Sequence, residues 1–196
     1  MQDYAFRRLR EEPLLLALLT YWEGKRGDRD VPDRRDIDPT EMSPALLPHL
    51  CLIEICEGDR LKVRLVGTEI VRQHKRDNTG KFADEYLKGE YLAYLTALYL
   101  DLRARRLPVL AESRFRHIDT QLETTRLLVP LTMGGADVRL VLMGQVFRYR
   151  SGQANAPIAQ PLDAGLLEVL NQIPLDRVKR DATRPPPPSS EADAPS

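Results

Sequence analysis

Cysteine and histidine are scarce in this sequence, which has 2 cysteines and 3 histidines among 196 residues. Cys51 and Cys56 lie in one apolar segment at a spacing that, on a strand, points their side chains to opposite faces. They therefore cannot bridge each other. The histidines are scattered, and two cysteines without their help cannot hold a metal ion. The sequence thus predicts neither a disulfide framework nor a metal site, and it favours a reducing cytoplasm.

An excess of one charge and a long apolar run are also missing. The 29 Lys and Arg residues balance 29 Asp and Glu residues, so the formal net charge is zero. A protein that mainly coats nucleic acid or an anionic membrane needs a sustained positive excess, which this composition excludes. The apolar run 14–19 is far shorter than the roughly 20 residues of a membrane span. Mixed charges before it are atypical of a signal peptide. We expect a soluble, cytoplasmic protein.

Hydrophobic residues make up 42% of the sequence and charged residues 30%, which is sufficient for the core and surface of one folded domain. Helical spacing and start signals predict a helix over 3–26 that is kinked or restarted at Pro13, a short helix over 38–47, a helix over 68–75 N-capped by Thr68, a longer helix over 89–106 and a terminal helix over 162–173. Alternating or apolar runs predict strands over 49–56, 61–67, 109–118, 125–133 and 138–149. This order predicts an α+β fold: a single five-stranded antiparallel sheet with a helical roof and an N-terminal flanking helix.

Composition divides the chain into three parts. We expect an N-terminal amphipathic flanking helix over 1–27, a folded domain over 28–178 and a disordered Pro-rich tail over 179–196. The folded part uses most of the length, so we expect no separate effector domain.

Several short motifs resemble a known family. They are Trp22, Gly27 and Pro32 followed by residues 35–39, then the segments 46–50, 63–68 and 76–81. Over roughly residues 15–150 the sequence resembles compact bacterial PAS-domain proteins. The resemblance implies a cytoplasmic sensory or interaction module without intrinsic catalytic activity. It carries no cofactor ligand with it.

A PAS-like fold implies a ligand pocket between the sheet and its helical roof. Our pocket candidates are His74, Tyr94, Leu98, Phe115, His117, Leu131 and Met143. Plain core packing is the alternative for the tyrosine, leucine and methionine side chains. Haem ligation by His74 or His117 is a further alternative. Flavin attachment is disfavoured because neither cysteine lies on the helical segment where the reactive thiol usually sits, and we expect no cofactor.

The first helix carries more apolar residues than one narrow stripe requires. They are Leu14, Leu15, Leu18, Leu19 and Trp22. An uncovered apolar stripe favours a partner, so we expect a homodimer through this helix. The alternative is that the helix only covers the sheet of its own chain.

The leading hypothesis is a non-catalytic regulatory module that binds a small ligand, a signalling protein, or both, and acts through protein–protein interaction. A small enzyme is the first alternative, with His74, His117 or Asp77 as general acid or base, although no nucleophile–base motif is present. A nucleotide-binding or nucleic-acid-binding module is the second. It would use the clusters Arg7, Arg8 and Arg10, Arg34 and Arg35, and Arg103, Arg105 and Arg106.

Overall fold

The computed structural model describes residues 1–117, 120–151 and 167–175. Its helices are α1 (Gln2–Glu11), α2 (Pro13–Arg26), α3 (Thr68–His74), α4 (Ala83–Tyr86) and α5 (Gly89–Arg105). Its strands are β1 (Leu50–Ile55), β2 (Leu61–Val66), β3 (Val109–His117), β4 (Thr120–Thr132), β5 (Val138–Ser151) and β6 (Leu167–Pro174). Short 3-10 helices span Arg34–Asp36, Pro39–Glu41, Leu47–His49 and Glu57–Asp59.

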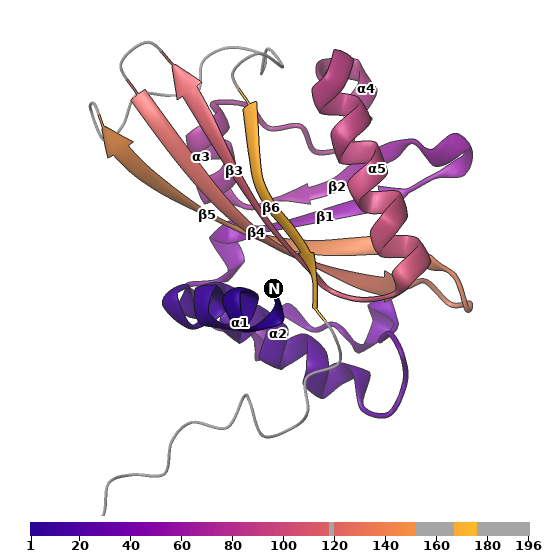
Figure 1. The fold of residues 1–196 in the computed structure, drawn as a ribbon. Coiled ribbons are helices and arrows are strands. Elements are labelled where there is room, and N and C mark those ends of the chain that lie inside the picture. The colour runs from indigo at the N-terminus through magenta and orange to yellow at the C-terminus, as the bar shows by residue number, and fades with distance from the viewer. Residues whose placement is uncertain (118–119, 152–166, 176–196) are drawn as a thin grey trace, which may run out of the picture.

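The described strands form one antiparallel sheet in the order β2-β1-β5-β4-β3-β6, with helices on both sides (Figure 1). Helices α3 to α5 cover one side, which we call the roof face, and α1 and α2 cover the other, the N-terminal face. Alternation along each strand sends side chains to two separate apolar cores. Leu98 and Leu128 belong to the roof-face core, and Leu127 and Leu131 to the N-terminal core.

The predicted α+β class is confirmed, but the sheet has six strands rather than five. The prediction of a terminal helix over 162–173 is wrong for residues 167–173, which belong to β6; residues 162–166 lie outside the described part. In so short an apolar segment, the spacing of the apolar residues does not distinguish a helix from a strand. Without a further strand beside β3, the backbone groups along that edge of the sheet would lack hydrogen-bond partners. The segment pairs with that edge from Phe115↔Leu167 to Val109↔Pro174.

The prediction of a helix restarted at Pro13 is confirmed, because α1 ends at Glu11 and α2 begins with Pro13 at its first position. Helix α2 packs closely on the sheet at Gly144. A Cβ atom there would lie 2.9 Å from side-chain carbons of both Leu15 and Leu18. The close approach buries the apolar stripe of α2 in the protein's own N-terminal core.

This burial corrects the predicted interface. Leu15, Leu18, Leu19 and Trp22 are at most 1% exposed, and the Trp22 indole donates a hydrogen bond to the Pro130 carbonyl (2.7 Å). Their apolar surface is already covered by the sheet, so they present none to a partner. Only Leu14 of the five predicted residues is partly exposed.

Two further local predictions are wrong. The segment 38–47 contains the 3-10 helix Pro39–Glu41 and the first residue of the 3-10 helix Leu47–His49 instead of one α-helix, and Met42 between them takes extended backbone angles. Thr68 is the first residue of α3, and Gly67 takes the N-cap position. A Cβ atom on Gly67 would lie 2.2 Å from the Pro48 carbonyl oxygen. Glycine is therefore required by this close approach of two backbone segments.

Candidate functional site

The structure separates the predicted pocket residues. His74, Tyr94, Leu98 and Met143 lie on the roof face. Leu131 belongs to the N-terminal core on the opposite side of the sheet, so its assignment to the pocket is wrong. Its place follows from strand alternation, because Leu128 of the same strand faces the roof. The side chains of Phe115 and His117 lie outside the described part of the structure.

The centre of the roof face holds a buried arginine that the sequence did not single out. Arg126 of β4 is 4% exposed, and its Nη2 donates a hydrogen bond to Ser113 Oγ on β3 (2.7 Å). The guanidinium also interacts with the Tyr91 hydroxyl from α5, where it partly offsets the rise in the pKa of Tyr91 that burial causes. Its Nε–H has no hydrogen-bond partner among the described residues. An arginine stays protonated in proteins, so a full positive charge lies inside the roof-face core.

The other buried charged groups of the described chain each have an ion-pair partner. Asp33 pairs with Arg35, Glu112 with Arg8, and Glu54 with Arg64 and Arg139. None of the ion pairs among the described residues includes Arg126. A buried charge without a counter-ion costs several kcal/mol of folding free energy. Arg126 is thus the exception in a structure that otherwise neutralises its buried charges.

Two hydroxyl groups near Arg126 also lack partners. Thr124 lies two residues before Arg126 on the same face of β4 and is 1% exposed, and its Oγ1 makes no hydrogen bond. The Tyr94 hydroxyl on α5 is likewise buried and unbonded. The Tyr94 ring stacks on Tyr91, with ring centroids 6.4 Å apart, and Tyr91 contacts the arginine. Buried polar groups in proteins are normally hydrogen-bonded, so this concentration marks a polar site rather than ordinary core.

His74 lies near the same cluster. Its imidazole meets the Phe147 ring edge-on, with centroids 5.8 Å apart. Burial lowers the pKa of His74 to about 4, and the charge of Arg126 contributes to the shift. The imidazole is therefore neutral near pH 7 and adds hydrogen-bonding capacity without charge. We call Arg126, Ser113, Thr124, Tyr91, Tyr94 and His74 the roof-face cluster.

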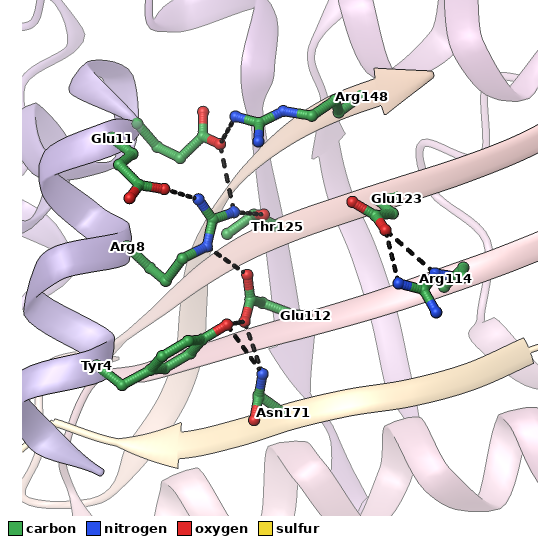
Figure 2. Close-up of polar contacts among 10 residues, drawn as sticks. Tyr4, Arg8, Glu11, Glu112, Arg114, Glu123, Thr125, Arg148 and Asn171 are labelled. Atoms are coloured by element: carbon green, nitrogen blue, oxygen red, sulfur yellow. Dashed lines mark hydrogen bonds and ion pairs between the residues drawn. The ribbon is translucent and has the colours of Figure 1, made fainter. Parts of the chain in front are cut away.

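A second polar network lies on the N-terminal face and fastens α1 to the sheet (Figure 2). Glu112, 6% exposed, accepts hydrogen bonds from Tyr4 Oη (2.7 Å), Arg8 Nε (2.8 Å) and Asn171 Nδ2 (2.8 Å). Burial acts to raise the pKa of Glu112, but these hydrogen bonds hold it below its usual value. Arg8 reaches Thr125 Oγ1 as well (3.3 Å). Only Ala5 and Leu9 of α1 are fully buried, so polar contacts carry much of its docking.

The two clusters are attached to the same stretch of sheet. In β3, Glu112 faces α1 and the next residue, Ser113, bonds Arg126. In β4, Thr125 contacts Arg8 while Arg126 faces the roof. The pairing of β3 with β6 also shifts register between Glu112 and Ser113. Such bulges are frequent beside functional sites. The two clusters therefore share the backbone of β3 and β4.

The arginine clusters of the nucleic-acid-binding alternative are in part neutralised, because Arg8, Arg35, Arg103 and Arg105 form ion pairs. Arg103 pairs with Asp59 (2.9 Å) and Arg105 with Asp101 (2.8 Å). An open hollow of about 470 Å³ beside the β4–β5 turn includes Arg35, which pairs with Asp33 at 3.0 Å. Paired surface arginines are ordinary solvated surface, so neither the clusters nor the hollow forms a distinct cationic site.

Among the described side chains of the enzyme alternative, no hydrogen bond or ion pair joins His74 to Asp77, and the side chain of His117 lies outside the described part. Asp77 is exposed, and its carboxylate accepts a hydrogen bond from the Thr79 amide (2.8 Å) in a local turn. Burial raises the pKa of the Cys51 thiol to about 12, so it is a poor nucleophile. Within the described residues, no group of three metal-ligating side chains is arranged around a common point. None of the described helices is long and apolar enough to cross a membrane.

The architecture defines the class of the protein: an α+β domain with one antiparallel sheet between a helical roof and two N-terminal helices. A sequence model of the PAS domain family matches residues 10–145. The match covers most of the chain, and the chain belongs to this family. It spans α2 through most of β5 and leaves β6 outside. A search of curated proteins returned no match. PAS domains are generally sensory or regulatory modules, and the family match indicates this general role for residues 10–145.

Proposed function

We propose that this PAS domain is a non-catalytic, ligand-regulated module whose small-molecule site is the roof-face cluster. The observation that carries the proposal is the group of three buried polar atoms without partners, Tyr94 Oη, Thr124 Oγ1 and Arg126 Nε. A folded protein retains such costly groups when they serve binding rather than stability. Leu98 and Met143 border the same core and supply apolar contact for a ligand.

The output runs through the N-terminal face to another protein. Helix α1 is the element suited to respond, since the Glu112 network attaches to the backbone that carries Ser113 and Arg126. Elements held by few apolar contacts open at lower free energy than the rest of a domain. A ligand that binds one arrangement of β3 and β4 more tightly shifts the population of that arrangement. The altered docking of α1 then changes the surface offered to a signalling partner, including a second copy of the chain.

Native mass spectrometry and thermal-shift screening of the freshly purified full chain test the proposal. We expect either a retained small molecule of defined mass or a saturable rise in melting temperature with members of a metabolite library. A ligand that binds only the native state raises stability by mass action. No retained mass and no shift with anionic, cationic or neutral compounds would contradict ligand regulation and leave a pure interaction scaffold.

A further inference from the structure

We propose that the roof-face cluster binds a small monocarboxylate, whose carboxylate is held by Arg126 and whose remaining part is apolar. The inference rests on the proposed function and names its ligand class. The charge balance of the cluster is the first step. Arg126 contributes one positive charge, and no ion pair among the described residues neutralises it. The other members of the cluster carry neutral hydroxyl groups or, near pH 7, a neutral imidazole.

The ligand must then supply one negative charge. A carboxylate does so, whereas a phosphate monoester carries roughly −1.5 to −2 at neutral pH and would leave negative charge buried without a partner. A neutral ligand would leave Arg126 uncompensated, and a cationic one would add to its charge. Among common anionic groups, the carboxylate therefore fits the charge of the site best.

The donors of the cluster suit a carboxylate as well. A guanidinium has five N–H groups in a fixed planar fork, and pairs of them bind the two oxygens of a carboxylate side by side. Ser113 uses one N–H of Nη2, and the Nε–H remains unbonded. The hydroxyl groups of Thr124 and Tyr94 are further donors without partners. The cluster thus holds more donors than acceptors, which is the composition expected of a site for an anionic acceptor.

The surroundings favour an apolar body attached to the carboxylate. Leu98 is fully buried, and Met143 is 7% exposed. The Met143 sulfur accepts a weak hydrogen bond from Tyr99 (3.8 Å). Sites for small molecules commonly combine such an apolar lining with a few polar groups that fix orientation. A thioether and leucine side chains adapt to apolar groups of different shape.

The first experiment compares charge classes on the wild-type full chain at pH 7. Straight-chain monocarboxylates from acetate to octanoate, benzoate and phenylacetate are each paired with the alcohol and the phosphate monoester of the same body. We expect at least one carboxylate to raise the melting temperature saturably and to titrate at one molecule per chain by calorimetry. Its alcohol should be without effect, and its phosphate ester should bind more weakly.

Variants then locate the site. Arg126→Met keeps an unbranched side chain, shorter than arginine, and removes the charge and the N–H donors; we expect it to weaken binding of the best carboxylate by about 100-fold or more. Arg105→Met is the matched control, since Arg105 is exposed and pairs with Asp101; its affinity should equal that of wild type. If Arg126→Met does not fold, Thr124→Val replaces an unbonded hydroxyl by a methyl group of the same shape. That variant should fold and weaken carboxylate binding about 5-fold.

The outcomes separate this inference from the function on which it rests. An alcohol or phosphate ester that matches its carboxylate, a retained ligand without an acid group, or full affinity in Arg126→Met would overturn the carboxylate assignment. Ligand regulation would survive the first two results. Absence of binding by every compound class, together with no retained mass, would remove both.

Discussion

At the scale of single residues, His74 offers a test of how tightly the roof-face cluster is enclosed. Its pKa of about 4 in the folded chain lies below the ordinary value near 6.5, because burial disfavours the charged imidazole. Between these values the unfolded chain binds more protons than the folded chain. The contribution of His74 to the free energy of unfolding is therefore fully present above about pH 6.5 and is lost as the pH falls toward 4. From pH 7 to pH 5 the shift predicts a loss of about 2 kcal/mol in the free energy of unfolding.

Urea denaturation of wild type and His74→Gln at both pH values measures this loss. The glutamine keeps a polar side chain of similar size but does not titrate, so the difference between the two pH values should nearly vanish. The depressed pKa of Glu69, about 2, places its folded-state titration below this window. An equal loss of stability in wild type and variant would show that another group titrates and that His74 is accessible to water.

Arg126 is a residue of the candidate site that the sequence analysis does not predict. The composition of the sequence does not single out Arg126, because an arginine is usually solvated, but its position in a predicted strand carries a signal. Strand alternation puts Arg126 on the same face as Leu128, which is fully buried. A charged residue on the apolar face of a predicted strand is informative in this way. Arg126 forms no ion pair with another described residue, and this depends on which residues the fold brings beside it, which the sequence does not show.

At the scale of elements, the docking of α1 is the contact most open to perturbation. Glu112 joins α1 to β3 and β6 through Tyr4, Arg8 and Asn171 (Figure 2). Glu112→Gln removes the charge and leaves Arg8 with a neutral amide oxygen in place of the Glu112 carboxylate. We expect amide exchange in α1 to become faster by a factor that corresponds to about 1.5–3 kcal/mol, because charged hydrogen bonds contribute this much. Hydrogen exchange read by mass spectrometry measures the change peptide by peptide.

Glu123→Gln is the matched control on the same face of the sheet. Its described ion pair, with Arg114 at 2.8 Å, joins β4 to β3. Exchange in α1 should stay at the wild-type rate in this variant, and exchange in β1 and β2 should stay unchanged in both. Equal acceleration of α1 by the two variants would show that loss of any ion pair on this face loosens the helix.

Element prediction from sequence succeeded where a long period or a hairpin signal was present. The helix over 89–106 corresponds to α5, and the strands around the turn 134–137 correspond to β4 and β5. It failed where the outcome depended on distant partners. Residues 167–173 form a strand because they pair with the edge of β3. The apolar stripe of α2 predicts that this helix packs on another apolar surface. The local sequence does not show whether that surface belongs to a second chain or to the helix's own sheet, which α2 approaches closely at Gly144.

At the scale of the whole molecule, the burial of α2 limits where a dimer can form. A stable protein–protein interface buries roughly 800 Å² on each partner. Four of the five predicted residues contribute nothing to such an area, since they are at most 1% exposed. We propose that a homodimer through the N-terminal helices instead uses their partly exposed residues, including Leu14, which packs against the edge of the N-terminal core and leaves part of its side chain uncovered. The dimer would then respond to the docking of α1, which precedes Leu14 in the chain.

Light scattering of the full chain over a range of concentrations tests this arrangement. Wild type should be dimeric, and Leu14→Glu should be monomeric, because a carboxylate on an apolar contact must be desolvated when the partner binds. Leu65→Glu is the control: Leu65 is 47% exposed on β2, so the same change is made outside the N-terminal helices. It should remain dimeric. A monomeric wild type would remove the homodimer, and a dimeric Leu14→Glu would place the interface elsewhere and uncouple it from α1.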